Sequence, residues 1–315
     1  MVRSEFTFPS ADGKTDIHAV EWVPGGPVRA VVQISHGLAE HILRYEALAA
    51  WLTERGFAVA GHDHLGHGTS VAHGAPRLYF GPRGSWDFLV EGLETRRRLL
   101  ADRFPGVPLF LVGHSMGSFL ARTYLIRFPG RVDGAILLGT GQVPPVPLAA
   151  CQALVALQIR RSGETAPAPN LDRLVFGRYN NCFAPSRTPL DWLSQNPENV
   201  DAYIADPLCG GVPTAGLFRE MLNGLAYIAR PEHLSQMDAG TLVLLASGSL
   251  DPVGGQGKDV EAVFRSFRRS GVRDVSIKLY PGLRHEILNE NCREEVFRDL
   301  CQWMTDRIPE KDAVR

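Results

Sequence analysis

Residues 109–117 read LFLVGHSMG, in which a short apolar run passes through the pattern G-x-S-x-G into a helix-like segment. The run at 109–112 predicts a buried strand, and the apolar spacing over 116–128 predicts a helix that stops at Pro129. A serine on a tight turn between a strand and a helix, with small residues on both sides so that the turn can close, is typical of an enzyme nucleophile. The helix N-terminus would direct its dipole and free N–H groups towards Ser115. The alternative is that Ser115 is an ordinary helix cap.

Short apolar runs alternate with helix-like segments along most of the chain. Because the runs are apolar on both faces, they predict an α/β fold with a mainly parallel sheet covered by helices on both sides. Strands are expected at 20–23, 30–34, 57–60, 109–112, 135–138, 242–246 and 275–279, and helices at 45–55, 86–103, 116–128, 258–269 and 294–303.

The stretch 140–234 interrupts this alternation. It contains no clear strand, opens with a proline-rich segment and continues into an apolar helix expected at 148–159. Such a stretch is far too long for a simple connection between two core strands. We therefore expect a core made of residues 1–139 and 235–315, with a helical cap inserted at 140–234.

The composition excludes several classes of protein. The 33 Lys and Arg residues are balanced by 34 Asp and Glu residues, so no nucleic-acid partner is expected. No apolar run approaches the roughly 18 residues of a membrane span, and the N-terminus lacks the apolar region of a signal peptide. The five cysteines include no C-x-x-C pair and match neither a disulfide framework nor a zinc cluster. We expect buried or half-buried free thiols and a cytoplasmic location; nothing in the sequence indicates an oligomeric state.

A nucleophilic serine needs an adjacent base, and the base needs an acid that orients it. Where a serine lies on such a turn, the chain order is serine, then acid, then histidine. His233 and His285 alone follow Ser115, and His233 lies inside the expected cap, whereas His285 comes just after the last expected strand. Asp251 follows the strand expected at 242–246. Because the carboxyl ends of parallel strands share one edge of a sheet, Ser115, Asp251 and His285 are predicted to meet there.

Two alternatives concern the acid. Asp251 precedes a proline and is also suited to forming an Asp-Pro turn. Asp238 is nearby, but it comes before the strand at 242–246 and would lie at the opposite edge of the sheet.

Acyl transfer also needs two backbone N–H groups that bind the developing oxyanion. One comes from the residue after the nucleophile, which is Met116. The second is expected from the loop after the strand at 30–34, which reads HGLAEH at 36–41. We expect Leu38 N–H to be this donor, and His36 to be structural.

The histidines of the segment 61–68, GHDHLGHG, suggest a different chemistry. Clustered imidazoles bind zinc, so H-x-H-x-x-H is a candidate metallo-hydrolase motif. However, Gly66 stands where the metallo-β-lactamase pattern requires Asp, and no second group of ligands follows downstream. We expect a structural loop of hydrogen-bonded histidines, with no metal and no cofactor.

These motifs together resemble the monoglyceride lipase branch of the α/β-hydrolase superfamily, also labelled serine aminopeptidase S33-like or lysophospholipase-like, over nearly the whole chain. The resemblance implies an α/β-hydrolase fold, a Ser115–His285–Asp251 triad, an oxyanion hole of Leu38 and Met116, and a mobile cap over an acyl tunnel. It also suggests that Glu40 and Arg44 lie near the polar head of a glyceride. The segments that carry it are HGLAEH at 36–41 with RY at 44–45, DHLGHGTS at 63–70, GHSMG at 113–117, GSLDP at 248–252 and RHE at 284–286.

One position departs from the family pattern. Monoglyceride lipases of the animal type carry a second histidine three residues after the catalytic one, near the glycerol head. Leu288 occupies that position here, which bears on glycerol recognition and not on ester hydrolysis.

The leading hypothesis is therefore a cofactor-independent serine hydrolase of fatty-acid esters, with a monoacylglycerol or lysophospholipid as the small-molecule substrate. A general carboxylesterase, or an amide, lactone or aminopeptidase-type hydrolase, is the alternative on the same triad, with Glu40 as the candidate anchor for a substrate amine. A non-catalytic binding module is a third hypothesis, because a fold does not determine a function. The apolar helix at 148–159, followed by Arg160 and Arg161, suggests a transient contact of the cap with a membrane surface.

Overall fold

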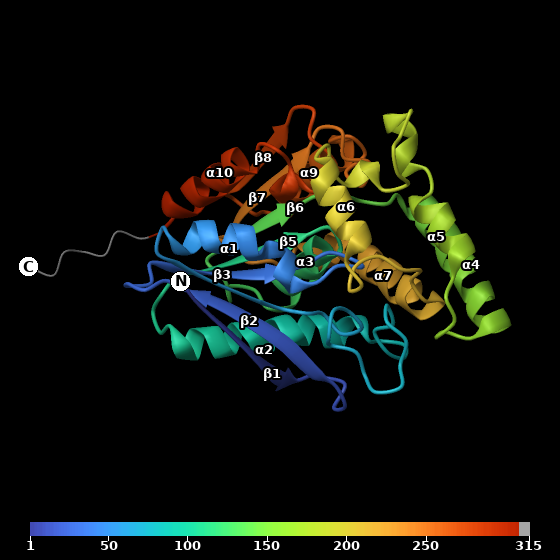
Figure 1. Ribbon diagram of the computed structural model, residues 1–315, viewed down its shortest axis with the longest axis horizontal. Coiled ribbons are helices and arrows are strands. Elements are labelled where there is room, and N and C mark those ends of the chain that lie inside the picture. Colours follow the sequence, from blue (N-terminus) through green and yellow to red (C-terminus); the bar gives the residue numbers. More distant parts are fainter. Residues whose placement is uncertain (309–315) are drawn as a thin grey trace, which may run out of the picture.

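The computed structural model describes residues 1–308 and is built around one eight-stranded sheet (Figure 1). The strand order is β1-β2-β4-β3-β5-β6-β7-β8, in which β2 pairs antiparallel with β1 and β4 and all other neighbours are parallel. The strands are β1 (Val2–Pro9), β2 (Asp16–Val23), β3 (Ala30–Ser35), β4 (Phe57–His62), β5 (Leu109–His114), β6 (Gly134–Leu138), β7 (Leu242–Gly248) and β8 (Val275–Tyr280).

Helices cover both faces of the sheet because its strands are apolar on both sides. On β3, Val31 faces one hydrophobic cluster and Val32 faces the other, as the twofold repeat of a strand requires. The first cluster includes residues of α2, α3 and α9, and the second includes residues of α1 and α10. The covering helices are α1 (Glu46–Thr53), α2 (Trp86–Arg103), α3 (Met116–Arg127), α9 (Lys258–Arg269) and α10 (Arg293–Thr305).

The chain between β6 and β7 is helical and contains no strand in the described residues. Its helix α7 packs against α3 and α4 and buries Leu217 and Phe218 completely, so it joins the core. Figure 1 shows α4 and α5 at the margin of the molecule, away from the sheet. The helices of this segment are α4 (Pro145–Ser162), α5 (Pro169–Phe176), α6 (Pro197–Ala205), α7 (Ala215–Ile228) and α8 (Pro231–Leu234).

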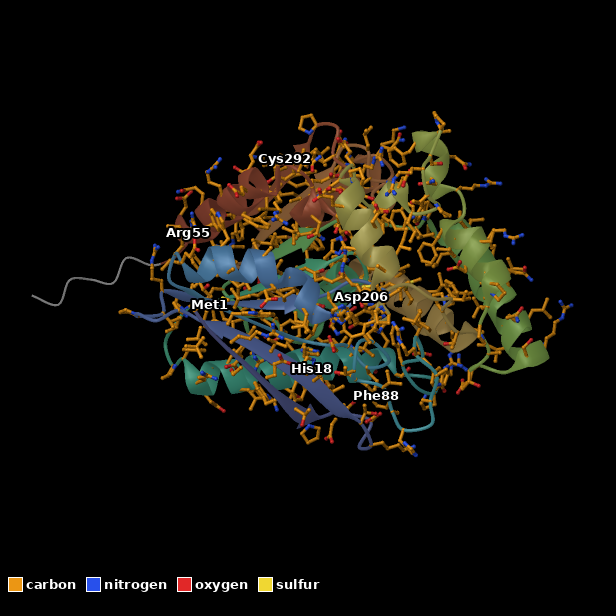
Figure 2. All side chains as sticks on the ribbon, viewed as in Figure 1. Met1, His18, Arg55, Phe88, Asp206 and Cys292 are labelled. Carbon is orange, nitrogen blue, oxygen red and sulfur yellow. The ribbon has the colours of Figure 1, made fainter. Side chains whose placement is uncertain are left out.

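The observed elements confirm the predicted α/β class, with the seven expected strands and six expected helices each present within a few residues of their predicted ends. The edge strand β1 was not predicted. Two of the five free cysteines, Cys182 and Cys292, are exposed, which contradicts the expected burial of the thiols (Cys292 is labelled in Figure 2). Within residues 1–308, no helix has both the length and the apolar character needed to cross a membrane.

Candidate active site

The turn between β5 and α3 holds Ser115 in a strained backbone conformation, with φ of 52° and ψ of −121°. Its two flanking glycines are needed for close packing. A Cβ on Gly117 would lie 2.0 Å from Ser35 O at the end of β3, and a Cβ on Gly113 would lie 2.5 Å from Gly117 O. The serine N–H donates to Leu138 O at 2.9 Å, which fastens the turn to the end of β6. The side chain of Ser115 is therefore presented at the carboxyl edge of the sheet, in the wall of a cavity.

Asp251 and His285 lie together beside this turn. His285 Nδ1 is 3.0 Å from each carboxylate oxygen of Asp251. Asp251 also accepts hydrogen bonds from Val253 N–H at 2.9 Å and Ser247 Oγ at 3.0 Å. Burial alone would raise the pKa of Asp251, but the nearby imidazole and these hydrogen bonds outweigh it and hold the pKa below its usual value. An ionised Asp251 is suited to holding the Nδ1–H tautomer of His285, which leaves Nε2 free to act as a base.

The imidazole of His285 is also fixed by two other rings. Its centroid lies 4.7 Å from that of His114, the residue before Ser115, and 5.1 Å from that of Trp192. His285 and Ser115 both line the cavity. Among the hydrogen bonds of the described residues, none joins Ser115 Oγ to His285, and the completed triad stays a prediction.

Leu38 and Met116, whose backbone N–H groups are the predicted oxyanion donors, line the same cavity. Neither group has an acceptor among the described residues, as expected for donors reserved for a ligand. The loop that carries Leu38 is held from both sides: Gly37 N–H donates to Glu40 Oε1 at 2.6 Å, and Gly210 N–H donates to Ala39 O at 2.8 Å. Leu38 and Met116 thus line the same cavity as Ser115, and their role as oxyanion donors stays a prediction.

Glu40 and Arg44 belong to a buried charge network that also contains Glu286. Arg44 Nη1 donates to Glu40 Oε2 and to Glu286 Oε1, each at 2.7 Å, and Nη2 donates to Glu286 Oε2 at 2.7 Å. Burial would raise the pKa of each carboxyl, but the Arg44 charge outweighs it and holds both pKa values below the usual range. Glu40 and Glu286 line the cavity, whereas Arg44 lies behind them.

The cavity has a volume of about 640 Å³ and is mainly apolar. Besides Ser115, His285 and the two glutamates, its polar lining residues include Gln142, Asp172 and Asp259. Its apolar wall comes from the chain between β6 and β7 and from α3, and includes Phe119, Phe176, Trp192, Met221, Leu222 and Leu225.

The chain matches a known protein family. The family model described as "Serine aminopeptidase, S33" matches residues 26–292. The chain belongs to this family.

Relatives of this S33 protein share nearly its whole length. It is 31% identical over 309 residues to the monoacylglycerol lipase of Mycolicibacterium smegmatis, covering 97% of this chain and 98% of the relative. It is 28% identical over 291 residues to human monoglyceride lipase, covering 91% and 86% of the two chains. A solved carboxyl esterase from Bacillus coagulans, in complex with glycerol, superimposes with a TM-score of 0.91 at 28% identity, covering 98% of this chain and 100% of that one. The S33 protein is thus a monoglyceride lipase-like α/β-hydrolase.

The histidines of the 62–67 segment are packing residues in this S33 protein. His64 N–H donates to His36 Nε2 at 2.9 Å, and His64 Nε2 lies 3.0 Å from Ser35 Oγ. Burial lowers the pKa of His62 and of His67 to about 3, so both rings are neutral at pH 7. Their burial agrees with the expected structural loop, but the rings are only partly hydrogen-bonded, since His62 Nδ1, His64 Nδ1 and His67 Nε2 are buried without a partner in the described chain.

Sequence reasoning did not identify three residues that contact the predicted site residues. Glu286 adjoins His285 in the sequence and His114 adjoins Ser115, so their proximity to the site was available as a signal. Trp192 belongs to the long segment between β6 and β7, and nothing in its local sequence indicates that it packs against His285.

Proposed function

We propose that the chain hydrolyses carboxylic esters of fatty acids, of the monoacylglycerol or lysophospholipid kind, through an acyl-enzyme on Ser115. The observation that carries this proposal is the His285–Asp251 pair, 3.0 Å apart, next to Ser115 and two unpartnered N–H groups at one cavity. The relatives support the coarser statement that the protein is a carboxylic ester hydrolase, since they include a monoacylglycerol lipase and a carboxyl esterase.

In the proposed mechanism, Ser115 Oγ attacks the ester carbonyl carbon while His285 Nε2 takes the hydroxyl proton. The N–H groups of Leu38 and Met116 bind the oxyanion of the tetrahedral intermediate. His285 then protonates the leaving alkoxide, and the acyl-enzyme remains. A water molecule, deprotonated by His285, attacks this acyl-enzyme and releases the fatty acid. Asp251 keeps the imidazole oriented and stabilises its charged form in both halves of the reaction.

We propose that residues 140–234 act as a cap that encloses the acyl chain. Support comes from the apolar cavity wall, to which this segment contributes Phe176, Met221 and Leu225. A cavity of about 640 Å³ is of the size that binds drug-sized and lipid-like ligands.

The polar head group is proposed to lie against Glu40 and Glu286, which reach the cavity surface. Arg44 would act through these carboxylates, because its donors are already engaged by them. Leu288 packs in the hydrophobic cluster with α1 and α10, so glycerol recognition falls to other side chains. Glu40 already accepts from Arg44, Gly37 N–H and Tyr45 Oη, so this carboxylate is poorly suited to anchoring a substrate amine, and an ester is favoured over a peptide N-terminus.

The test is an ester panel of monoacylglycerols, lysophosphatidylcholine and p-nitrophenyl esters from short to long chain, with wild type and Ser115→Ala. We expect a preference for long-chain monoacylglycerol or lysophospholipid, and a loss of kcat of about 10⁴-fold or more in the variant. Ser270→Ala is the matched control, because that hydroxyl donates only to Phe267 O of its own helix.

Full activity in a folded Ser115→Ala protein would refute the mechanism. Activity that is lost in the variant but limited to short synthetic esters would retain Ser115 as nucleophile and contradict the fatty-acid ester assignment, leaving the general carboxylesterase.

A further inference from the structure

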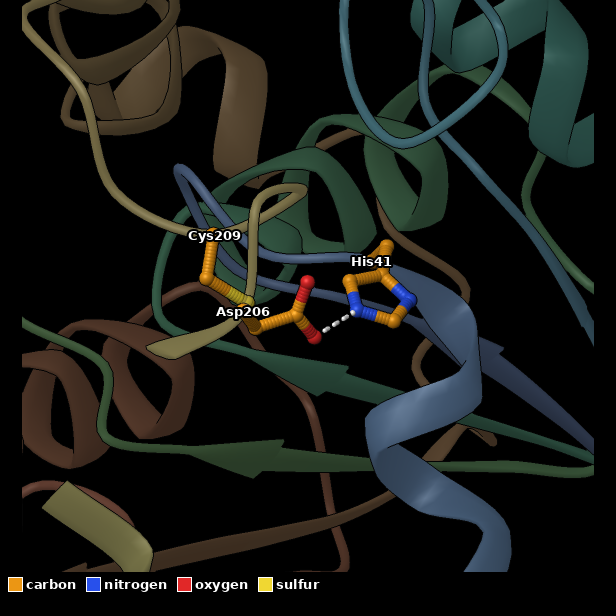
Figure 3. Close-up of side chains that lie close together, drawn as sticks. All are labelled: His41, Asp206 and Cys209. Atoms are coloured by element: carbon orange, nitrogen blue, oxygen red, sulfur yellow. Dashed lines mark hydrogen bonds and ion pairs between the residues drawn. The ribbon is translucent and has the colours of Figure 1, made fainter. Parts of the chain in front are cut away.

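Three side chains of different chemistry converge outside the proposed triad: His41, Asp206 and Cys209 (Figure 3). One imidazole nitrogen, one carboxylate oxygen and the thiol sulfur all lie within 4.8 Å of one another. His41 Nε2 is 2.8 Å from Asp206 Oδ2. His41 and Cys209 are buried, whereas the Asp206 side chain keeps 29% of its surface exposed and so leaves the cluster open to solvent on one side.

We propose that His41, Asp206 and Cys209 form a binding site for a thiophilic divalent cation of the Zn²⁺ type. Zinc takes sulfur ligands at about 2.3 Å and nitrogen or oxygen ligands at about 2.0–2.2 Å, so tetrahedral coordination separates its ligand atoms by about 3.3–3.8 Å. The three donor atoms lie within 4.8 Å of one another. The 2.8 Å separation of His41 Nε2 and Asp206 Oδ2 is shorter than this spacing, and rotation of the Asp206 carboxylate away from His41 would widen it and make room for the ion. The exposed side of Asp206 leaves the fourth position to water.

The donor set selects the kind of ion. A thiolate and an imidazole favour Zn²⁺ and similar transition-metal ions, whereas Mg²⁺ and Ca²⁺ prefer sites made of oxygen ligands. A hydrogen-bonded trio without metal is the competing explanation of the same contacts. The two explanations differ in one respect, since only a metal site requires the sulfur of Cys209.

The loop that carries Asp206 and Cys209 is held in place by further contacts, as the surroundings of a metal site usually are. Leu208 N–H donates to Asp206 Oδ1 at 2.8 Å. Arg77 donates from Nη1 to Pro207 O and from Nη2 to Leu208 O, each at 2.5 Å. The ligands on this loop are therefore ordered before an ion binds, which lowers the entropic cost of binding.

The position of the cluster gives the ion a structural role. His41 lies just beyond the loop that carries Leu38, whereas Asp206 and Cys209 belong to the chain between β6 and β7. The two segments already touch, since Tyr203 Oη donates to Ala39 O at 2.9 Å and Gly210 N–H donates to the same oxygen at 2.8 Å. A bound cation would clamp them together, and an ion that binds only the folded chain stabilises it.

The experiment titrates the metal-free, untagged full-length protein with Co²⁺ and follows the thiolate-to-cobalt charge-transfer absorption. We expect saturation near one equivalent, displacement by Zn²⁺, and a rise in the thermal unfolding midpoint with Zn²⁺. Cys209→Ser should abolish the charge-transfer band, and Asp206→Asn should weaken binding about tenfold or more. Cys182→Ser and Cys292→Ser, which alter exposed thiols, are the matched controls and should leave the band unchanged.

Several results would overturn the proposal. These are the absence of a charge-transfer band in the wild type, a band that survives in folded Cys209→Ser, or a band that disappears with Cys182→Ser. If Cys209→Ser does not fold, Asp206→Asn is the decisive variant, because the Asp206 side chain is partly exposed and can be replaced without loss of the fold. Unchanged Co²⁺ affinity in Asp206→Asn would then contradict the site. None of these readouts uses a substrate, so they are independent of the proposed hydrolysis.

Discussion

Arg44 shows how a single side chain can organise the candidate site without lining its cavity. It lies between Glu40 and Glu286, and both carboxyl groups are buried. Because their pKa values are lowered in the folded chain, the network contributes stability that is present above the ordinary carboxyl pKa and is lost as the pH falls through the folded values. The charge of Arg44 therefore matters most near neutral pH.

We expect Arg44→Met to lower the free energy of unfolding by about 3–5 kcal/mol at pH 7, because the buried Glu286 loses its arginine partner and Glu40 retains only His114 as an ion-pair partner in the described chain. The loss should shrink towards pH 4, where protonated carboxyls no longer need that charge. Arg44→Lys keeps the charge but not the paired geometry, and should lose less at pH 7. Urea unfolding at several pH values provides the measurement, and a loss for Arg44→Met that is independent of pH would contradict the charge argument.

For single residues, the sequence predicts the candidate site best where chain order restricts which residue can play a role. Once Ser115 was chosen, elimination led to His285 and strand position led to Asp251, and their side chains lie 3.0 Å apart. The bridge from Arg44 to Glu286 could not be predicted, because it joins residues 242 positions apart. The cluster of His41, Asp206 and Cys209 was hidden for the same reason: cysteine spacing alone reveals a metal site only when the ligands are close in sequence.

Among the elements, the contact between α3 and β3 is the one on which the serine turn depends most directly. Gly117→Ala would place a Cβ 2.0 Å from Ser35 O, and backbone cannot move aside as a flexible side chain can. We expect a loss of at least about 3 kcal/mol in the free energy of unfolding, at the upper end of the usual cost of overpacking, together with a loss of esterase activity. Gly25→Ala is the control, since a Cβ there meets nothing within 4 Å. Thermal unfolding of both variants tests this, and equal stability would contradict the packing argument.

Elements were predictable from the sequence to the extent that they are buried on both faces. The central strands read as uninterrupted apolar runs, and β3 and β4 are buried at every position. The edge strand β1 is exposed along most of its length, so its sequence, VRSEFTFP, lacks the apolar signal and its pairing with β2 could not be foreseen. Of the helices between β6 and β7, the sequence predicts only α4 individually, at 148–159, because the ends of the others depend on how they pack.

For the whole molecule, buried neutral histidines make stability depend on pH. Burial lowers the pKa of His67 to about 3 on folding. At pH values between about 3 and the ordinary histidine pKa, the His67 ring therefore binds a proton in the unfolded chain but not in the folded one. Stability must therefore fall as the pH is lowered, by about 1.4 kcal/mol per pH unit for each such histidine. His67 stacks on Phe80, its Nε2 has no partner in the described chain and its Nδ1 makes only a long contact of 3.4 Å with Leu65 O, so Phe is a suitable replacement.

We expect His67→Phe to reduce the slope of unfolding free energy against pH by about 1.4 kcal/mol per unit between pH 6 and pH 4. Urea unfolding at half-unit intervals gives the slope. His73→Phe adds the same ring at an exposed loop position and should retain the wild-type slope. If His67→Phe also retains it, the neutral state assigned to His67 is wrong.

The membrane contact predicted for the cap is also a property of the whole molecule, because it depends on where the exposed apolar side chains lie on its surface. Helix α4 exposes Val146, Leu154 and Leu157, and it lies at the margin of the molecule, away from α2 (Figure 1). Arg160 and Arg161 in its last turn would favour anionic lipid. Complete burial of a leucine side chain stabilises by about 1.5–3 kcal/mol. Leu154 and Leu157 are about half exposed in the free protein, so each can contribute about half of that energy to membrane binding.

The double variant Leu154→Gln, Leu157→Gln is therefore expected to bind vesicles about ten- to hundredfold more weakly, measured by co-sedimentation with phosphatidylcholine vesicles that contain an anionic lipid. Leu99→Gln removes an exposed leucine from α2 and should leave binding unchanged. Both variants should keep wild-type activity on a short, water-soluble ester, because neither Leu154 nor Leu157 lines the cavity. Equal sedimentation of the double variant and the wild type would place the contact elsewhere, and absence of wild-type binding to neutral and anionic vesicles alike would exclude it.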